Sequence, residues 1–132
     1  MNQSGAALTP ARRYLQDVWS YRPDQGWKHL ADSPEPLVAA PSFVSGHSIF
    51  IMGGDNGTLA SRINQLKDQH PGFSKLIRVF NTQTETWSTA GTLPLSLVTT
   101  NACVYGRTVY VPGGEDRPGH RSNRVFLWPL LP

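Results

Sequence analysis

The sequence contains a single cysteine, Cys103, so no disulfide can form within the chain and the redox compartment stays open. No stretch approaches the roughly 18 consecutive apolar residues of a membrane-spanning helix, so we expect no membrane partner. The first residues, MNQSGAALTPARRYLQD, do not contain the apolar core of a secretory signal peptide. These features leave the compartment of the protein unknown.

Charged residues make up only 16% of the 132 residues, and the formal net charge is +3. Lys and Arg are scattered instead of clustered, so we expect no nucleic-acid partner. The four histidines and the one cysteine do not have the spacing of a zinc site, and no Gly-rich nucleotide-binding motif is present. We therefore expect no metal and no organic cofactor.

Glycine and proline, by contrast, are abundant, with twelve and eleven residues. Dense turn residues in a chain with 39% hydrophobic residues favour short strands joined by turns over helices. The length suits one domain with a packed core. The composition thus predicts an all-β domain.

The predicted strands form a repeat with a spacing of 60 positions. DVWSYRPDQGWKHL (17–30) matches IRVFNTQTETWSTA (77–90), with an alternating strand, a polar turn and a tryptophan opening the next strand. AAPSFVSGHSIFIMGGDNG (39–57) matches TTNACVYGRTVYVPGGEDR (99–117), where two strands end in a glycine pair. Because both matches have the same spacing, the similarity extends over a whole unit.

A third copy of the pattern begins at NRVFLW (123–128), where Val125 lies 46 positions after Val79. The longer first spacing reflects an insertion at 59–73. The unit is therefore four strands over about 46 residues, close to a kelch repeat. The chain resembles the kelch family in its strand ending in Gly-Gly, its aromatic strand, its polar turn and its spaced tryptophan.

This resemblance implies an all-β fold of kelch-type β-propeller blades, with two full four-stranded blades plus a further strand, as part of a six-bladed propeller. It assigns residues 17–132 to the propeller segment, with repeats at about 17–57 and 77–117 and a closing strand at 123–128. Residues 1–16 form an N-terminal extension. Fewer than the four to eight blades of a closed propeller are present, so we expect self-assembly or a longer kelch chain to complete it.

Three side chains are expected in the core. Trp27 and Trp87 follow equivalent turns and should pack between blades. Cys103 should pack as a small apolar residue.

Polar side chains follow both glycine pairs. Asp55 and Glu115 come directly after them, so they should occupy matching places on one rim of neighbouring blades. The insertion at 59–73 leaves the same rim and carries Lys67 and His70. It has room for one helical turn, which the Pro-Gly pair after His70 ends. Long loops beside a channel are often functional, although surface decoration is the alternative.

The segment GGEDRPGHR (113–121) is the strongest candidate site. Its Pro-Gly pair folds the loop back, so that Glu115 and Arg121 can approach each other. A glutamate beside an arginine can act as a general acid and base, and the guanidinium offers a planar fork for a substrate carboxylate. The alternative is a salt bridge that only pins the loop.

The same segment resembles the G-E-x-[KR]-P-G-x-R-[ST] stretch of the N-acetylneuraminate epimerases, or sialic acid mutarotases, a family of six-bladed kelch propellers. DQHPGFSKLI (68–77) is similar to the branch described as cyclically permuted mutarotases. The resemblance implies that Glu115 is the proton acceptor and Arg121 its partner at the substrate. Arg117 is a further candidate for the sugar carboxylate, and Asp55, Lys67 and His70 are candidates for its hydroxyls.

The reaction implied is mutarotation of an acidic sugar. A proton leaves the anomeric hydroxyl, the ring opens, and a proton is delivered to the ring oxygen. This needs one titratable group with water or a second acid, and no cofactor. The alternatives are a non-catalytic kelch module that binds a protein or glycan, and a truncated inactive remnant.

Overall fold

The computed structural model describes residues 11–130, so part of the N-terminal extension expected at 1–16 lies outside the described residues. The strands are β1 (Trp19–Arg22), β2 (Gly26–His29), β3 (Ser42–Ser45), β4 (Ser48–Gly54), β5 (Ser74–Asn81), β6 (Thr86–Thr92), β7 (Cys103–Tyr105), β8 (Thr108–Pro112), β9 (Glu115–Arg117), β10 (His120–Arg121) and β11 (Val125–Pro129). The all-β fold class expected from composition is confirmed, apart from one short helical insertion.

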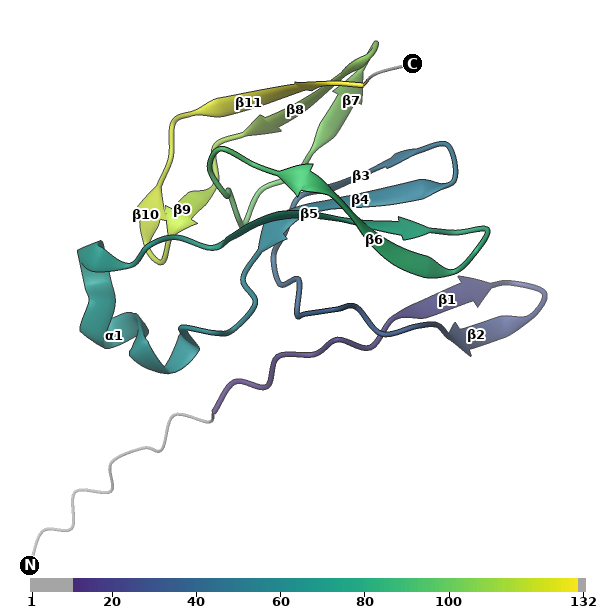
Figure 1. Ribbon diagram of the computed structural model, residues 1–132, viewed down its shortest axis with the longest axis horizontal. Coiled ribbons are helices and arrows are strands. Elements are labelled where there is room, and N and C mark those ends of the chain that lie inside the picture. The colour runs from purple at the N-terminus through teal and green to yellow at the C-terminus, as the bar shows by residue number, and fades with distance from the viewer. Residues whose placement is uncertain (1–10, 131–132) are drawn as a thin grey trace, which may run out of the picture.

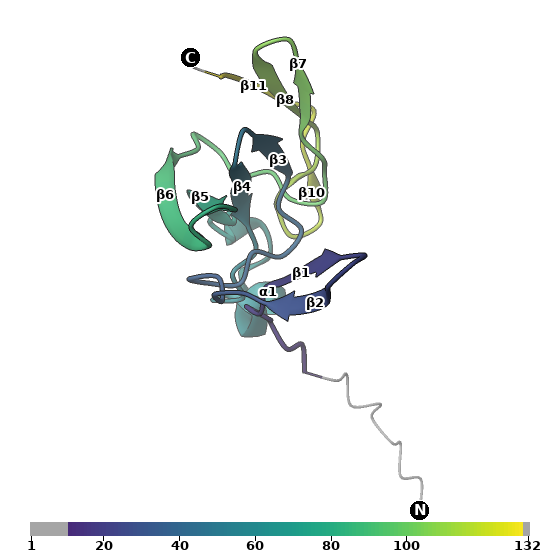
Figure 2. The ribbon, with the colours of Figure 1, turned by 90° about the vertical axis from the view of Figure 1, so that its right-hand side faces the viewer.

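Three antiparallel sheets follow one another along the molecule (Figure 1). The first sheet is the β1–β2 hairpin, the middle sheet has the order β3-β4-β5-β6, and the last sheet has the order β11-β8-β7. Figure 2 shows the middle sheet between the other two. Strands β9 and β10 form a separate small hairpin below the last sheet.

The sheets group the strands differently from the sequence repeat. The first repeat supplies β1 to β4, the second supplies β5 to β8, and residues 123–128 contain most of β11. The middle sheet joins the last two strands of the first repeat to the first two of the second, because β4 pairs with β5 across the insertion. A complete four-stranded sheet therefore needs strands from two neighbouring repeats.

The insertion holds the helical turn that the sequence predicts. Two 3₁₀ turns, Ala60–Arg62 and Lys67–Gln69, flank the short helix α1 (Ile63–Leu66). The helical backbone ends at His70, which is extended ahead of Pro71. No helix among residues 11–130 is long and apolar enough to cross a membrane.

The core lies between the middle sheet and the last sheet. Phe43 of β3 stacks on Phe50 of β4 with ring centroids 4.8 Å apart, and Trp128 of β11 meets both rings edge-on at 5.8 Å. Val109 and Val111 of β8 complete this contact and are almost fully buried. Burial of each such side chain contributes about 1.5–3 kcal/mol, so this contact holds the two sheets together.

Two polar contacts link the middle sheet to the first sheet and to the segment that follows it. Nε1 of Trp87 in β6 donates to the carbonyl oxygen of Ala31 at 3.0 Å, and Lys28 pairs with Glu85 at 2.9 Å. Half-buried Trp87 thus lies between sheets, as predicted. The prediction that Trp27 is a core residue is wrong, because 70% of it is exposed and no sheet within residues 11–130 covers its face.

The environment of Cys103 also differs from the one that the sequence predicts. It is exposed, because β7 is an edge strand of the last sheet and Cys103 lies on the face turned away from the core. Its cross-strand partner is Tyr110, which alternates along β8 with the buried Val109 and Val111.

Candidate functional site

Asp55 and Glu115 occupy equivalent positions after β4 and β8. Asp55 exchanges two backbone hydrogen bonds with Val38, at 2.9 and 3.2 Å, and Glu115 exchanges two with Val98, at 2.9 and 3.0 Å. Val38 and Val98 are themselves 60 positions apart. The backbone bridge that fixes each carboxylate is therefore repeated, as the spacing predicts.

The second glycine of each pair makes this bridge possible. Gly54 and Gly114 have φ values of 104° and 82°, which side chains other than glycine rarely adopt. A Cβ at Gly114 would lie 2.5 Å from the carbonyl oxygen of Val98. The glycine therefore lets the chain pass close to Val98, and Glu115 follows directly in position to pair with Val98.

The β9–β10 hairpin brings Glu115 and Arg121 together. Pro118 and Gly119 form its turn, Arg121 is the register partner of Glu115, and Nε of Arg121 lies 3.4 Å from Oε1 of Glu115. The amide of Gly119 donates to Oε2 of Glu115 at 3.3 Å. The approach predicted from the Pro-Gly turn is confirmed, and both carboxylate oxygens have partners from the same hairpin.

A cavity of about 840 Å³ is lined by both carboxylate residues. Asp55 and Glu115 line it together with their bridge partners Val38 and Val98. Further lining residues come from the insertion region, the turn of the β9–β10 hairpin and the segment that precedes β1; those of the insertion region are Ala60, Ser61, Ile63, Asn64 and Phe73. The cavity therefore joins parts of the chain that are distant in sequence.

Two polar residues of the segment before β1, Arg12 and Tyr14, also line the cavity, and the sequence patterns did not predict this. The hydroxyl of Tyr14 donates to Oδ2 of Asp55 at 2.9 Å, while the amide of Gly57 donates to Oδ1 at 2.9 Å. A Cβ at Gly57 would lie 2.7 Å from the ring of Tyr14, so a glycine is needed beneath this ring. Arg12 lines the same cavity. The sequence offered one indication that this segment packs on the domain, because Tyr14 is the only aromatic residue in the first 16 positions.

The environment of Tyr14 favours its protonated form. Burial raises the pKa of the Tyr14 hydroxyl above its usual 10.0, and the hydrogen bond and the charge of Asp55 raise this pKa further, while Arg12 acts in the opposite direction. Tyr14 therefore remains a donor to Asp55 throughout the neutral range.

Replacing Tyr14 by Phe is expected to lower the free energy of unfolding by about 1 kcal/mol at pH 7, because Asp55 loses a hydrogen bond. A raised folded-state pKa means that this contribution is present below pH 10 and is lost as the pH rises through the folded pKa. Urea unfolding at pH 7 and above pH 10 measures the difference, and a tyrosinate absorbance titration should show one step above pH 10 missing from the variant. An equal stability difference at both pH values would contradict this assignment.

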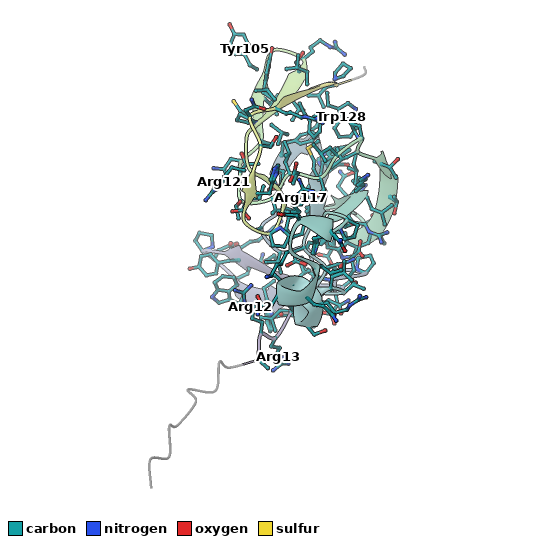
Figure 3. All side chains as sticks on the ribbon, turned by 90° about the vertical axis from the view of Figure 1, so that its left-hand side faces the viewer. Arg12, Arg13, Tyr105, Arg117, Arg121 and Trp128 are labelled. Carbon is teal, nitrogen blue, oxygen red and sulfur yellow. The ribbon has the colours of Figure 1, made fainter. Side chains whose placement is uncertain are left out.

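The two arginines of the hairpin do not line the cavity within the described chain. Arg121 is 76% exposed, whereas Glu115 is 19% exposed, and Figure 3 shows Arg121 projecting from the edge of the molecule. Arg117 instead donates through Nη1 to the carbonyl oxygen of Asp68 at 3.0 Å and lies 3.7 Å from Asp116. Arg117 therefore ties the hairpin to the insertion.

Lys67 and His70 also lie away from the cavity lining of residues 11–130. Lys67 is exposed at the helical turn. His70 is buried, where its Nδ1 accepts a hydrogen bond from the amide of Gly72 at 3.0 Å and its ring lies beside Phe73. In this structure His70 fixes the end of the insertion. Of the six candidates, Asp55 and Glu115 line the cavity, and Arg121 contacts Glu115 without lining it.

The described residues were also searched for side chains that could bind a metal ion together. Within residues 11–130, no three His, Cys, Asp or Glu side chains gather in an arrangement that could hold a metal ion.

Comparisons with known proteins bear on the fold. The solved structure of YjhT aligns with this chain at a TM-score of 0.72 and 21% sequence identity, over 86% of this chain and 40% of YjhT. Kelch-like protein 25 of Xenopus tropicalis is 29% identical over 104 residues, which is 78% of this chain and 15% of that protein. The fold is a kelch-type β-propeller fold. No protein-family model matches the chain.

The middle sheet is thus a complete four-stranded kelch-type blade, while the first and last sheets hold two and three strands of neighbouring blades within residues 11–130. The glycine pairs end the second strand of the middle sheet and follow the second strand of the last sheet in chain order. The chain spans less than half the length of YjhT and a small part of Kelch-like protein 25. At 21% identity, the structural match shows the fold alone.

Proposed function

We propose that this kelch-type segment binds an acidic sugar of the N-acetylneuraminate class and accelerates its mutarotation. The observation that carries the proposal is the position of Glu115, which lines a cavity of about 840 Å³ while it contacts Arg121. The motif that contains both residues resembles the corresponding stretch of the N-acetylneuraminate epimerases.

Glu115 is the proton-transferring group in this proposal. Its carboxylate accepts the proton of the anomeric hydroxyl while the ring C–O bond breaks and a carbonyl forms, and the ring oxygen takes up a proton from water. Ring closure on the opposite face of the carbonyl reverses these transfers and yields the other anomer. The Gly119 amide and Arg121 hold the Glu115 carboxylate in one orientation.

Two arginines are available for the carboxylate of the sugar. Arg121 contacts Glu115 at 3.4 Å from outside the cavity lining, and Arg12 lines the cavity from the segment before β1. A guanidinium is suited to bidentate binding of a carboxylate. Asp55, held by Tyr14 and Gly57, offers acceptor oxygens to sugar hydroxyls from the neighbouring blade.

Exchange spectroscopy by NMR tests the proposal on a mixture of the α and β anomers of N-acetylneuraminate. We expect the wild-type chain to raise the exchange rate at least about tenfold over buffer, since positioned acid–base groups contribute about 10²–10⁴-fold in rate. Glucose serves as the neutral-sugar control and should not respond. An exchange rate equal to that in buffer excludes catalysis by this chain.

A second candidate is a non-catalytic kelch module that binds a protein or glycan. The similarity to Kelch-like protein 25, which covers 78% of this chain, is compatible with this candidate. A sugar-dependent thermal shift without faster exchange would favour glycan binding, and the absence of both effects would favour a protein partner.

A further inference from the structure

The insertion between β4 and β5 is longer than the middle sheet needs. Gly54 of β4 and Ser74 of β5 are register partners, so a short turn could join the two strands at this point. The chain instead runs through two 3₁₀ turns and helix α1 before it returns to β5 (Figure 1). Long loops in compact domains are often functional, so we expect a role for the insertion beyond closing the sheet.

The insertion presents only uncharged side chains to the cavity. Its lining residues, called the insertion lining, are Ala60, Ser61, Ile63, Asn64 and Phe73. The charged residues of the same insertion, none of which lines the cavity formed by the described residues, are Arg62, Lys67 and Asp68. The lining residues that carry charge come from elsewhere in the chain and are Arg12, Asp55 and Glu115.

Ile63 and Phe73 are the large apolar side chains of the insertion lining. Ile63 begins α1, and Phe73 directly precedes β5. Both are half-buried, whereas Ser61 and Asn64 are exposed. Phe73 also lies beside the buried ring of His70, with ring centroids 5.6 Å apart. The insertion lining thus combines apolar surface with the side-chain amide of Asn64.

The β9–β10 hairpin holds the insertion in place. Nη1 of Arg117 donates to the carbonyl oxygen of Asp68 at 3.0 Å, across 49 positions of the sequence. Gly72 has a φ of 96°, and a Cβ there would lie 2.9 Å from the carbonyl oxygen of Asp116. The end of the insertion therefore packs on the backbone of the hairpin that carries Glu115, which fixes the insertion relative to this carboxylate.

We propose that the insertion lining recognises the N-acyl group of the sugar, with Ile63 and Phe73 against the acyl methyl group and the Asn64 amide beside the acyl amide. This inference rests on the proposed function, because it takes an acidic sugar of the N-acetylneuraminate class as the ligand. An acetamido group joins a methyl group to an uncharged amide, and the insertion lining offers apolar surface and an uncharged amide. A hydroxyl group in its place would leave the two apolar side chains in contact with water.

Ligand titration by NMR tests the proposal on the full chain with two sugars. One is N-acetylneuraminate, and the other is the analogue that carries a hydroxyl group in place of the acetamido group. The wild type should bind the N-acyl sugar about tenfold more tightly, since one small apolar substituent in a fitted pocket contributes a factor of about 10–200. Ile63→Ser should reduce this preference to about threefold or less and leave the affinity for the hydroxyl analogue unchanged.

Leu66→Ser is the matched control for Ile63→Ser. Leu66 belongs to the same helix and is half-buried, but it is not among the residues that line the cavity within the described chain. This variant should keep the wild-type preference for the N-acyl sugar. The pair of sugars separates recognition from folding, because a variant that has lost its fold loses affinity for both sugars alike.

Arg117→Gln tests whether the contact with Asp68 positions the insertion. Trypsin cuts after exposed Arg62 and Lys67, so the cleavage rate reports on opening of the insertion without any sugar. Loss of a hydrogen bond from a charged group should speed this cleavage about tenfold and lower the preference for the N-acyl sugar. Arg117→Lys should restore part of both effects, and Arg124→Gln, at an exposed arginine outside the cavity lining of residues 11–130, should change neither.

The results distinguish failure of this inference from failure of the proposed function. A preference for the N-acyl sugar that Ile63→Ser removes supports the inference, even where the chain does not accelerate anomer exchange. Equal affinities for the two sugars overturn the inference, while faster exchange of either sugar would leave the proposed function in place. A preference that survives Ile63→Ser overturns the inference as well. If neither sugar binds, the proposed function fails, and the inference fails with it.

Discussion

Replacing Glu115 by Gln is expected to reduce the anomer exchange rate to that of buffer, a loss of about tenfold or more. Glutamine has almost the same shape, and its amide oxygen can still accept the hydrogen bond from Gly119. It cannot accept the proton of the anomeric hydroxyl, however, so the loop is preserved while proton transfer is lost.

Glu85→Gln is the matched control for this experiment. Glu85 is 42% exposed in its side chain and pairs with Lys28 at the first blade, away from the cavity lining. The exchange rate should be unchanged in this variant. If Glu115→Gln is as active as the wild type, the contact with Arg121 only pins the hairpin. Thermal unfolding of the two variants shows whether an activity loss follows from lost structure.

Replacing Gly114 by Ala is expected to lower the free energy of unfolding by about 2–4 kcal/mol. Two effects add at this position. The backbone has a φ of 82°, which strains any residue other than glycine, and the new Cβ would lie 2.5 Å from the carbonyl oxygen of Val98. Relief of this overlap requires the Val98–Glu115 bridge to open, so sugar binding should weaken as well.

Gly106→Ala separates these two effects. Gly106 has a φ of 60°, but a Cβ there would meet no atom within 4 Å. The variant therefore carries the backbone strain without the overlap, and it should lose only about 1 kcal/mol. Urea unfolding of both variants measures the difference. Equal losses in the two would show that the close approach to Val98 does not constrain the turn.

The 60-position repeat predicted much of the site because backbone geometry repeats with the sequence. It placed Asp55 and Glu115 on equivalent positions, and the structure gives them the same backbone bridge. The Pro-Gly turn predicted the contact between Glu115 and Arg121, because the few residues between them leave little freedom.

The sequence did not predict in which direction several side chains point. Arg117 and His70 were candidates by their proximity to the rim, but each is engaged in local contacts of the hairpin and the insertion. Tyr14 and Arg12 come from a segment without a counterpart in the repeat, so no pattern could connect Tyr14 to Asp55, 41 positions away.

By itself the sequence determined the strands, their turns and the equivalence of the two carboxylates, because these depend on local residue patterns and on a repeat that imposes the same backbone twice. Only the tertiary structure decided which strands share a sheet, that the segment at Tyr14 closes the cavity, and that Trp27 is exposed while Trp87 is covered. The reason is physical. Burial depends on which distant surface packs against a residue. Two similar local patterns therefore differ when, among residues 11–130, only one of them is covered on its aromatic face.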